Sequence, residues 1–294
     1  MTALVAEGKR PKNFDGGRLL IYAVLAVASL FFLMPLWVML MTSFKSMAEI
    51  REGQILYWPQ HFTADAWPRA WSSACTGLTC DGVRVGFWNS IRILVPSVIL
   101  SIALGGLTGY AMAFYRVPGA ILLFAILLIG AFIPYQVFIY PMVRVFSMIG
   151  LYDSLAGIVV VHIIFGLSLM TLLFRNYFSS LPVELFNAAR VDGAGFFAIL
   201  RHVMLPMSAP IVIVATILQV TGIWNDFILG LTFAGRANRP MTVLLNNIVN
   251  STQGEAAYDV DMAATILTAL VPLIVYFASG RWFVRGVAAG AVKG

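Results

Sequence analysis

The hydrophobic pattern of this chain consists of six long apolar runs separated by shorter polar stretches. About 20 predominantly apolar residues suffice for an α-helix to cross the hydrocarbon core of a bilayer. Within that core, only helices and closed barrels satisfy every backbone hydrogen bond. The pattern therefore predicts an all-α polytopic membrane protein with six transmembrane helices. The runs cover residues 19–41, 93–114, 121–143, 155–174, 211–231 and 262–280.

Two of the predicted spans carry residues that shape helices in lipid. Gly105, Gly106 and Gly109 lie in the second span, and such small residues let a neighbouring helix approach closely. Pro134 and Pro141 lie in the third span, where a proline removes a backbone hydrogen bond. We expect a close helix contact at the glycines and a kink near the outer end of the third span.

Composition supports the membrane class, and charge orients the loops. The 294 residues are 60% hydrophobic and 11% charged, with a formal net charge of +6. No basic cluster interleaved with aromatic residues is present, which argues against a nucleic-acid partner. Lys and Arg recur in residues 1–18, in loop 181–206 and after residue 280, as in cytoplasmic segments. We expect cytoplasmic tails at 1–18 and 286–294, and outer loops at 44–86 and 234–261.

The outer loop 44–86 contains both cysteines of the chain. Cys75 and Cys80 occur in the sequence CTGLTC. Disulfides persist on the extracytoplasmic face, where this loop is expected. Two interpretations stay open: a local disulfide that closes a small ring, or two free thiols. A closed metal site is disfavoured because the pair has no nearby His or further Cys to complete four ligands.

A part-polar stretch, residues 181–206, interrupts the apolar pattern and predicts a helix, a tight turn and a second helix. Ser180 is a suitable N-cap for the first helix, and Pro182 fits its first turn. Glu184 suits the positive end of the helix dipole. The first helix is therefore expected to begin near residue 181.

The turn and the second helix follow from the next residues. Gly193 tolerates the left-handed conformation that ends many helices. Asp192 can then cap a second helix over residues 194–204, which Pro206 stops. On the first helix, Leu185, Ala188 and Ala189 share one face by their spacing, and the small alanines would let that face enter a groove on another protein.

Two polar groups stand out in the apolar runs as candidates for a substrate path. His162 lies within the fourth run; an intramembrane ionisable residue marks a functional site unless it serves only to pack helices together. Trp224, Asn225 and Asp226 end the fifth run, and an indole, an amide and a carboxylate can stack on and hydrogen-bond a sugar ring. The alternative for this group is an interfacial tryptophan followed by a helix-terminal polar pair.

Catalytic motifs are absent from the sequence. There is no GxxxxGK[ST] phosphate loop, no His/Cys/carboxylate metal set and no Ser-His-Asp arrangement. We expect a non-catalytic subunit without a cofactor of its own. A secondary transporter would need ion-coupling charges in mid-span or broken helices, and apart from His162 such charges are nearly absent. A purely structural membrane protein remains the other alternative.

The 181–206 stretch resembles the cytoplasmic loop of permease subunits in binding-protein-dependent ABC importers. The motif of that loop reads EAA, then DGA, then I-x-LP. Asn187-Ala188-Ala189, Asp192-Gly193-Ala194 and Met204-Leu205-Pro206 occupy these positions. One departure is Asn187, which replaces the glutamate of EAA; Glu184, about one turn earlier, is a candidate substitute.

This resemblance implies the type I ABC importer permease fold, with the first helix of the loop docked on an ATPase subunit. It also implies two ATPase copies that bind ATP and Mg²⁺, a second permease subunit in a heterodimer, an extracytoplasmic binding protein, and a bacterial or archaeal cytoplasmic membrane. The implied ATPase contacts are Glu184, Leu185, Asn187, Ala188, Ala189, Asp192, Gly193 and Ala194.

Further residues resemble the maltose-type second permease subunits of sugar importers. The run Trp224-Asn225-Asp226-Phe227 and the chain's ending are similar to theirs, and CTGLTC with ELFNAARVDGAG looks like glucose/mannose-type subunits. An oligosaccharide or a glycerol-phosphate is the alternative substrate. The resemblance also implies that the outer loop near residue 252 contacts the binding protein, through Thr252, Gln253, Gly254 and Glu255.

Overall fold

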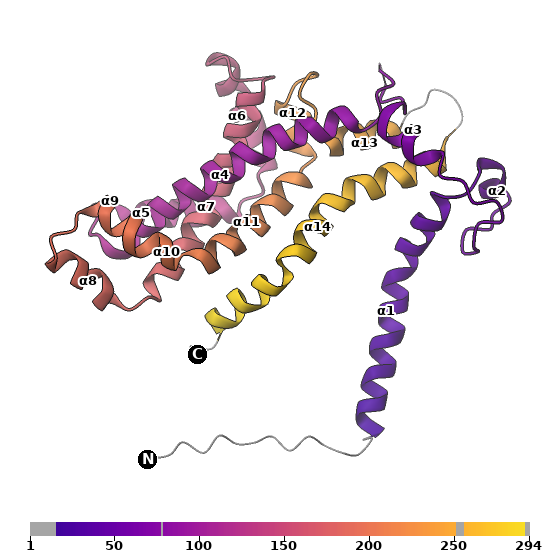
Figure 1. Cartoon of the computed structure of the whole chain (residues 1–294). Helices are drawn as coiled ribbons and strands as arrows, with labels where there is room; N and C mark the ends of the chain where they lie inside the picture. Colours follow the sequence, from indigo (N-terminus) through magenta and orange to yellow (C-terminus); the bar gives the residue numbers. More distant parts are fainter. Residues whose placement is uncertain (1–15, 78, 251–255, 292–294) are drawn as a thin grey trace.

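The computed structural model describes residues 16–77, 79–250 and 256–291. Regular structure in these residues is entirely helical, which confirms the all-α prediction (Figure 1). Three long helices, α4 (Arg84–Phe114), α7 (Leu155–Ser179) and α14 (Tyr258–Ala291), run between two ends of the molecule. One end carries α8 (Val183–Val191), α9 (Phe196–Ile199) and α10 (Leu205–Met207), and we name it the docking end. The far end carries α3 (Ala66–Ser72) and α13 (Met241–Val249).

Four described helices are long and apolar enough to cross a membrane, against the six spans expected. They are α1 (Gly16–Thr42), α4 (Arg84–Phe114), α7 (Leu155–Ser179) and the segment Tyr258–Ser279 of α14 (Tyr258–Ala291). The pair Phe196–Met207 and Ala209–Trp224, bent by 78°, makes a fifth if it counts as one broken span. α14 also starts earlier and ends later than the predicted sixth span, and it continues through part of the expected 286–294 tail.

The third predicted span is two helices instead of one kinked helix. α5 (Ala120–Phe132) and α6 (Gln136–Met148) are separated by residues 133–135. Ile133 has φ −75° and ψ 129°, which is extended backbone. A residue before proline is pushed out of the helical region by the proline ring, so Pro134 breaks the helix here. Pro141 lies inside α6 and does not interrupt it.

The fifth predicted span also ends early. α11 (Ala209–Trp224) stops before Asn225, and the short helix α12 (Ile228–Phe233) follows after a break. The amide of Asn225 still donates to the Thr221 carbonyl oxygen at 3.2 Å, but the chain then leaves the helix axis. The break places Asn225 and Asp226 between two helices.

The outer loop predicted at 44–86 folds against the far end. It contains α2 (Met47–Arg51) and α3, and the Arg69 guanidinium pairs with the Asp259 carboxylate of α14 at 3.3 Å. The structure joins Cys75 and Cys80 by a disulfide, in agreement with the first of the two alternatives. The Lys45 side chain is buried, and its ammonium donates to the Gln54 carbonyl oxygen.

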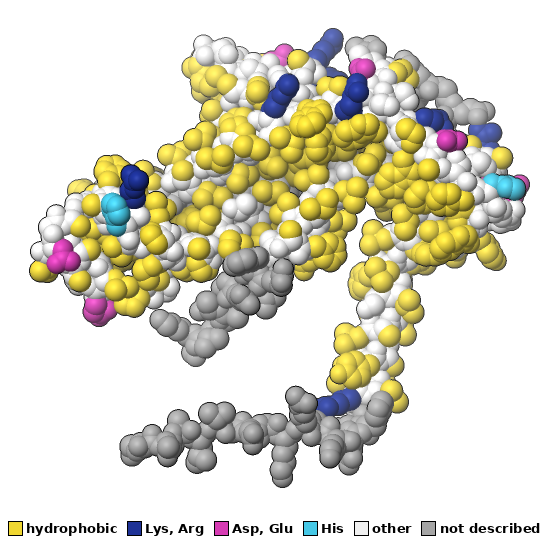
Figure 2. All heavy atoms as spheres, viewed as in Figure 1, with side chains coloured by type: hydrophobic (Ala, Val, Ile, Leu, Met, Phe, Trp, Pro, Cys, Tyr) yellow, Lys and Arg dark blue, Asp and Glu magenta, His cyan; other side chains and the backbone are white. Residues whose placement is uncertain are grey.

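α1 stands apart from the other long helices (Figure 1). Its only buried residues are Met41 and Thr42, at the end that meets the far end of the molecule. Apolar side chains cover the rest of the helix, as Figure 2 shows, and Phe32 is 73% exposed. An apolar helix without partners in its own chain is stable only in lipid or against another subunit.

Glycines set the closest helix contact in the chain, between α4 and α7. A Cβ added at Gly105 would come within 2.3 Å of the Met170 Cβ, and one added at Gly109 within 2.7 Å of the Phe174 Cβ. Gly106 faces an ordinary gap, where an added Cβ would be 3.7 Å from the Phe174 ring. The close packing expected from these small residues is confirmed.

Alanine at Gly109 is expected to damage the fold far more than alanine at Gly106. The Gly109 methyl would also lie 2.7 Å from the Arg175 backbone nitrogen, which cannot move without shifting α7. Overpacking of this kind typically costs about 1–3 kcal/mol. Thermal unfolding of the purified transporter, followed by loss of the monodisperse peak, measures the difference. Equal stability of the two variants would contradict the tight α4–α7 contact.

Candidate functional site

The docking helix α8 begins two residues later than the sequence predicts. Ser180 ends α7 instead of capping α8, and Pro182 occupies the N-cap position. The Ser180 amide donates to the Asn176 and Tyr177 carbonyl oxygens of α7, so it belongs to the preceding helix. Glu184 lies in the first turn of α8, where a carboxylate favours the helix dipole, as expected.

The turn after α8 has the predicted left-handed glycine. Gly193 has φ +80°, and its amide donates to the Arg190 carbonyl oxygen at 3.0 Å. The next amide, of Ala194, reaches back to the Ala189 carbonyl oxygen at 3.0 Å. These two bonds form a Schellman motif, which satisfies carbonyls that the helix end would otherwise leave unpaired.

The second helix differs from the prediction at both ends. It begins at Phe196 after an extended Gly195, so Asp192 caps no helix here. It passes through a π-helical turn, η1 (Leu200–Met204), and continues into α10. The helix passes the predicted end at residue 204 and ends at Met207, one residue after Pro206.

A single side chain anchors α8 to the body of the protein. Phe186 is 3% exposed, and its ring stacks on that of Phe114 with centroids 4.5 Å apart. It also meets the Tyr115 ring edge-on at 5.5 Å. The sequence analysis missed this anchor. The signal in the sequence is that Phe186 is the one aromatic residue of the α8 segment VELFNAARV.

Most of the remaining surface of α8 is open. Leu185 is 42% exposed, Ala188 is exposed and Ala189 is half-buried. The structure adds Val191, which is 87% exposed, and Phe197 of α9, which is also exposed. Exposed apolar side chains beside polar ones are typical of a protein interface. Glu184 and Asn187 are exposed on the same helix.

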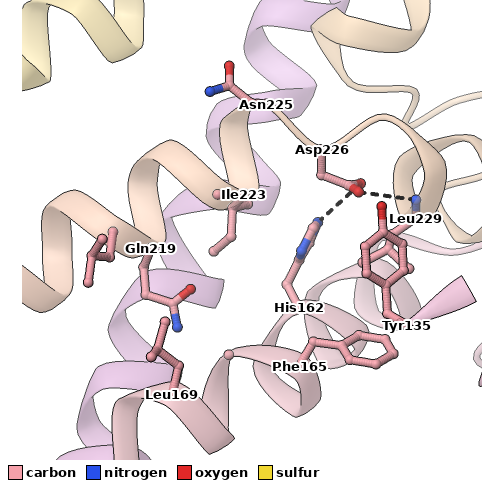
Figure 3. Close-up of a pocket in the computed structure, with 12 residues that line it drawn as sticks. Tyr135, His162, Phe165, Leu169, Gln219, Ile223, Asn225, Asp226 and Leu229 are labelled. Atoms are coloured by element: carbon pink, nitrogen blue, oxygen red, sulfur yellow. Dashed lines mark hydrogen bonds and ion pairs between the residues drawn. The ribbon is translucent and has the colours of Figure 1, made fainter. Parts of the chain in front are cut away.

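A second feature is a cavity of about 380 Å³ between α7 and α11, towards the far end (Figure 3). Its wall combines aromatic, aliphatic and polar side chains, the usual composition of a small-molecule site. The lining residues are Tyr135, His162, Phe165, Gly166, Leu169, Leu218, Gln219, Gly222, Ile223, Asn225, Asp226 and Leu229. The structure thus brings together His162, Asn225 and Asp226, three of the four predicted path residues.

Asp226 is held in a fixed orientation at one end of this cavity. Its Oδ2 accepts the Gly230 amide at 2.8 Å, and its Oδ1 accepts the Leu229 amide at 3.3 Å. The same Oδ2 lies 3.9 Å from His162 Nε2, with both side chains less than 10% exposed. That separation is too long for a direct hydrogen bond, and an oxygen atom between the two groups could bridge them. Figure 3 shows the two side chains facing each other.

Trp224 does not belong to this cavity, contrary to the prediction. It is 1% exposed, and its indole donates to the Thr268 carbonyl oxygen of α14 at 2.9 Å. Its ring packs edge-on against Phe87 of α4. Asn225 is the C-cap residue of α11 and lies exposed at the edge of the cavity; Figure 3 shows its side chain pointing away from His162 and Asp226.

The remaining predicted residues lie outside what the structure describes. Thr252, Gln253, Gly254 and Glu255 fall in the undescribed segment 251–255. Among the described residues, no group of three or more His, Cys, Asp or Glu side chains could hold a metal ion. The sequence analysis also missed Gln219 and Tyr135 of the cavity wall. The signal for Gln219 was its polar amide within an otherwise apolar run.

The sequence of this chain is similar to those of several known transport permeases. The osmoprotective compounds uptake permease protein GgtD of Synechocystis sp. is 35% identical over 218 residues, which cover 74% of this chain and 72% of that protein. The glucose import system permease protein GlcU of Saccharolobus solfataricus is 29% identical and covers 93% of this chain and 95% of its own. Two other curated relatives are matched over 62% of their own lengths.

A solved structure and a family both agree with this likeness. A chain of a bacterial ABC transporter involved in the import of the acidic polysaccharide alginate superposes with a TM-score of 0.75 and 20% identity. It covers 92% of this chain and 98% of its own, which supports the permease fold. Residues 101–289 match a family model, and this range contains α8 and every residue that lines the cavity. The chain therefore belongs to the family of binding-protein-dependent transport system inner membrane components.

Proposed function

We propose that this chain forms half of the translocation path of an ABC importer for a hexose, glucose or mannose. The observation that carries the proposal is the link between an open docking helix, α8, and a polar cavity through the bent pair that leads into α11. Relatives named for glucose, alpha-glucoside and arabinooligosaccharide transport support a sugar. The glucose permease and the arabinooligosaccharide permease each match over nearly the whole of both chains, so the choice of a hexose rests on the small volume of the cavity.

The chemistry of the cavity is compatible with a sugar. Tyr135 and Phe165 offer ring faces, and the carboxylate of Asp226 and the amide of Asn225 offer hydrogen bonds to hydroxyl groups. A cavity of about 380 Å³ is at the small end of the usual range for ligand sites. No Lys or Arg lines it, so a glycerol-phosphate, whose phosphate needs cationic or amide donors, is disfavoured.

The partners follow from the exposed surfaces. The chain is a non-catalytic permease subunit, and ATP hydrolysis belongs to a partner ATPase. In our proposal two ATPase copies bind ATP and Mg²⁺, and one receives the open face of α8. A second permease subunit completes the path and covers part of the exposed α1, and lipid covers the rest. A binding protein delivers the sugar at the far end, and the docking end and both termini face the cytoplasm.

The proposed cycle uses these parts in order. ATP binding closes the ATPase pair and moves α8, which is tied to α4 through Phe186 and Phe114. The bent pair passes this movement to α11, which forms one wall of the cavity. The cavity then opens toward the binding protein, accepts the sugar, and reopens to the cytoplasm after hydrolysis.

Uptake by vesicles that carry the assembled transporter tests the proposal. We expect ATP-dependent uptake of labelled glucose that mannose inhibits and that maltose, trehalose and glycerol phosphate do not. Vesicles with ATP withheld are the control. Inhibition by maltose alone would transfer the assignment to an oligosaccharide importer, and uptake that persists without ATP would contradict the ABC mechanism.

A further inference from the structure

We infer that Gln219 is a specificity-determining contact for a sugar hydroxyl group in the cavity between α7 and α11. This inference rests on the proposed function and assigns one hydrogen bond of the substrate to one residue. Gln219 lies in the middle of α11, in a helix whose other buried residues are mostly apolar. Figure 3 shows its side chain extending from α11 into the cavity toward α7.

The first support is a buried donor that has no partner. Gln219 is 7% exposed, and its Nε2 has no hydrogen-bond partner among the described residues. An unsatisfied polar group in a buried position carries its full desolvation penalty, so native proteins rarely keep one without a reason. A ligand oxygen that enters the cavity would satisfy this group.

The second support is the shape of the opposite wall. A Cβ added at Gly166 of α7 would lie 2.3 Å from Gln219 Nε2. A larger residue at this position would force the Gln219 amide to move from its place between the two helices. The same cavity lining contains the Asp226 carboxylate, which follows the end of α11.

The two polar groups complement each other chemically. The Asp226 carboxylate only accepts hydrogen bonds, whereas the Gln219 amide supplies two donor hydrogens and one acceptor. A sugar hydroxyl can both donate and accept a hydrogen bond. One hydroxyl group can therefore donate to the Asp226 carboxylate while another accepts from the Gln219 amide. A site built to hydrogen-bond a hydroxyl rejects the analogue that lacks it, because its own groups are then left unpaired.

Binding of labelled sugar to the whole transporter, trapped with ADP and vanadate, tests this assignment. The probes are glucose and its 2-, 3-, 4- and 6-deoxy analogues. We expect Gln219→Leu to weaken glucose binding about tenfold, the loss that one good hydrogen bond represents. We also expect the wild type to bind one deoxy analogue about tenfold more weakly than it binds glucose. The Gln219→Leu variant should bind that analogue and glucose with equal affinity.

A second variant guards against a mutant that fails to assemble. Gly166→Ala leaves Gln219 in place but fills the space of its amide, so it should also weaken glucose binding. Gly130→Ala in α5 is the matched control, because an added Cβ there meets nothing within 4 Å. The control Gly130→Ala should bind glucose like the wild type. If Gln219→Leu and Gly166→Ala also bind glucose like the wild type, or if Gln219→Leu still discriminates against the same deoxy analogue, the inference is wrong. A wild-type complex that binds none of the probes overturns the proposed hexose, and the inference with it.

Discussion

Gly193→Pro is expected to abolish ATP-driven uptake while the subunit still inserts into the membrane. Proline locks φ near −65°, but residue 193 has φ +80°. The substitution also removes the amide that donates to the Arg190 carbonyl oxygen. A proline whose ring cannot adopt the native φ destabilises by more than about 1 kcal/mol, and here the cost falls on the turn that orients α8 against α9.

A matched proline two residues away distinguishes the effect of disrupting the turn at Gly193 from the general effect of adding a proline to this segment. Gly195 has φ −81° and ψ 176°, which the proline ring allows, and an added Cβ there meets nothing within 4 Å. We expect Gly195→Pro to retain most uptake. Membrane abundance of both variants, measured beside uptake of labelled glucose, checks insertion. Normal transport by Gly193→Pro would remove the docking role from this turn.

Phe186→Ala is expected to uncouple ATP hydrolysis from transport. The Phe186 ring is the buried contact that holds α8 on Phe114 and Tyr115, and removing a buried phenylalanine side chain typically costs about 3–5 kcal/mol. The global fold should survive, because the α4–α7 contact lies deeper in the molecule. A loosened α8 can still bind the ATPase but no longer moves α4 with it.

The ratio of ATP hydrolysed to sugar transported is the measurement that distinguishes uncoupling from inactivity. We expect this ratio to rise several-fold in Phe186→Ala and to stay near the wild-type value in Phe186→Leu, which keeps most of the buried apolar volume. A fall in hydrolysis and transport together, at an unchanged ratio, would mean that Phe186 serves assembly instead of coupling.

The sequence predicted the helical class and the turn at Gly193 because both depend on local rules. Long apolar runs report helices in lipid, and only glycine takes a left-handed φ without strain. The start of α8 was misplaced because Ser180 and Pro182 offer two starts, and α7 extends far enough to claim Ser180. The break at Pro134 was predicted only as a kink, since the hydrophobic pattern continues across it.

The cavity was predicted only in part because facing directions depend on tertiary packing. Trp224, Asn225 and Asp226 are consecutive, so they cannot all point into one cavity from a helix. The buried indole was assigned to the path because its chemistry suits a sugar. Gln219 was overlooked because a lone amide in an apolar run has no motif, and its proximity to Asp226 depends on how the chain turns after α11 ends at Trp224.

Because Phe196–Met207 meets Ala209–Trp224 at a bend of 78°, rotation at the bend would move the far end of α11. The pivot point is near Ser208, which is fully buried and donates from Oγ to the Met204 carbonyl oxygen at 2.6 Å. With 16 residues α11 is about 24 Å long, so a tilt of about 10° swings its far tip by about 4 Å. A displacement of this size is comparable with the 3.9 Å separation between His162 Nε2 and Asp226 Oδ2. In the proposed cycle, a small rotation of the helix next to α8 is therefore enough to change the distance between the walls of the cavity.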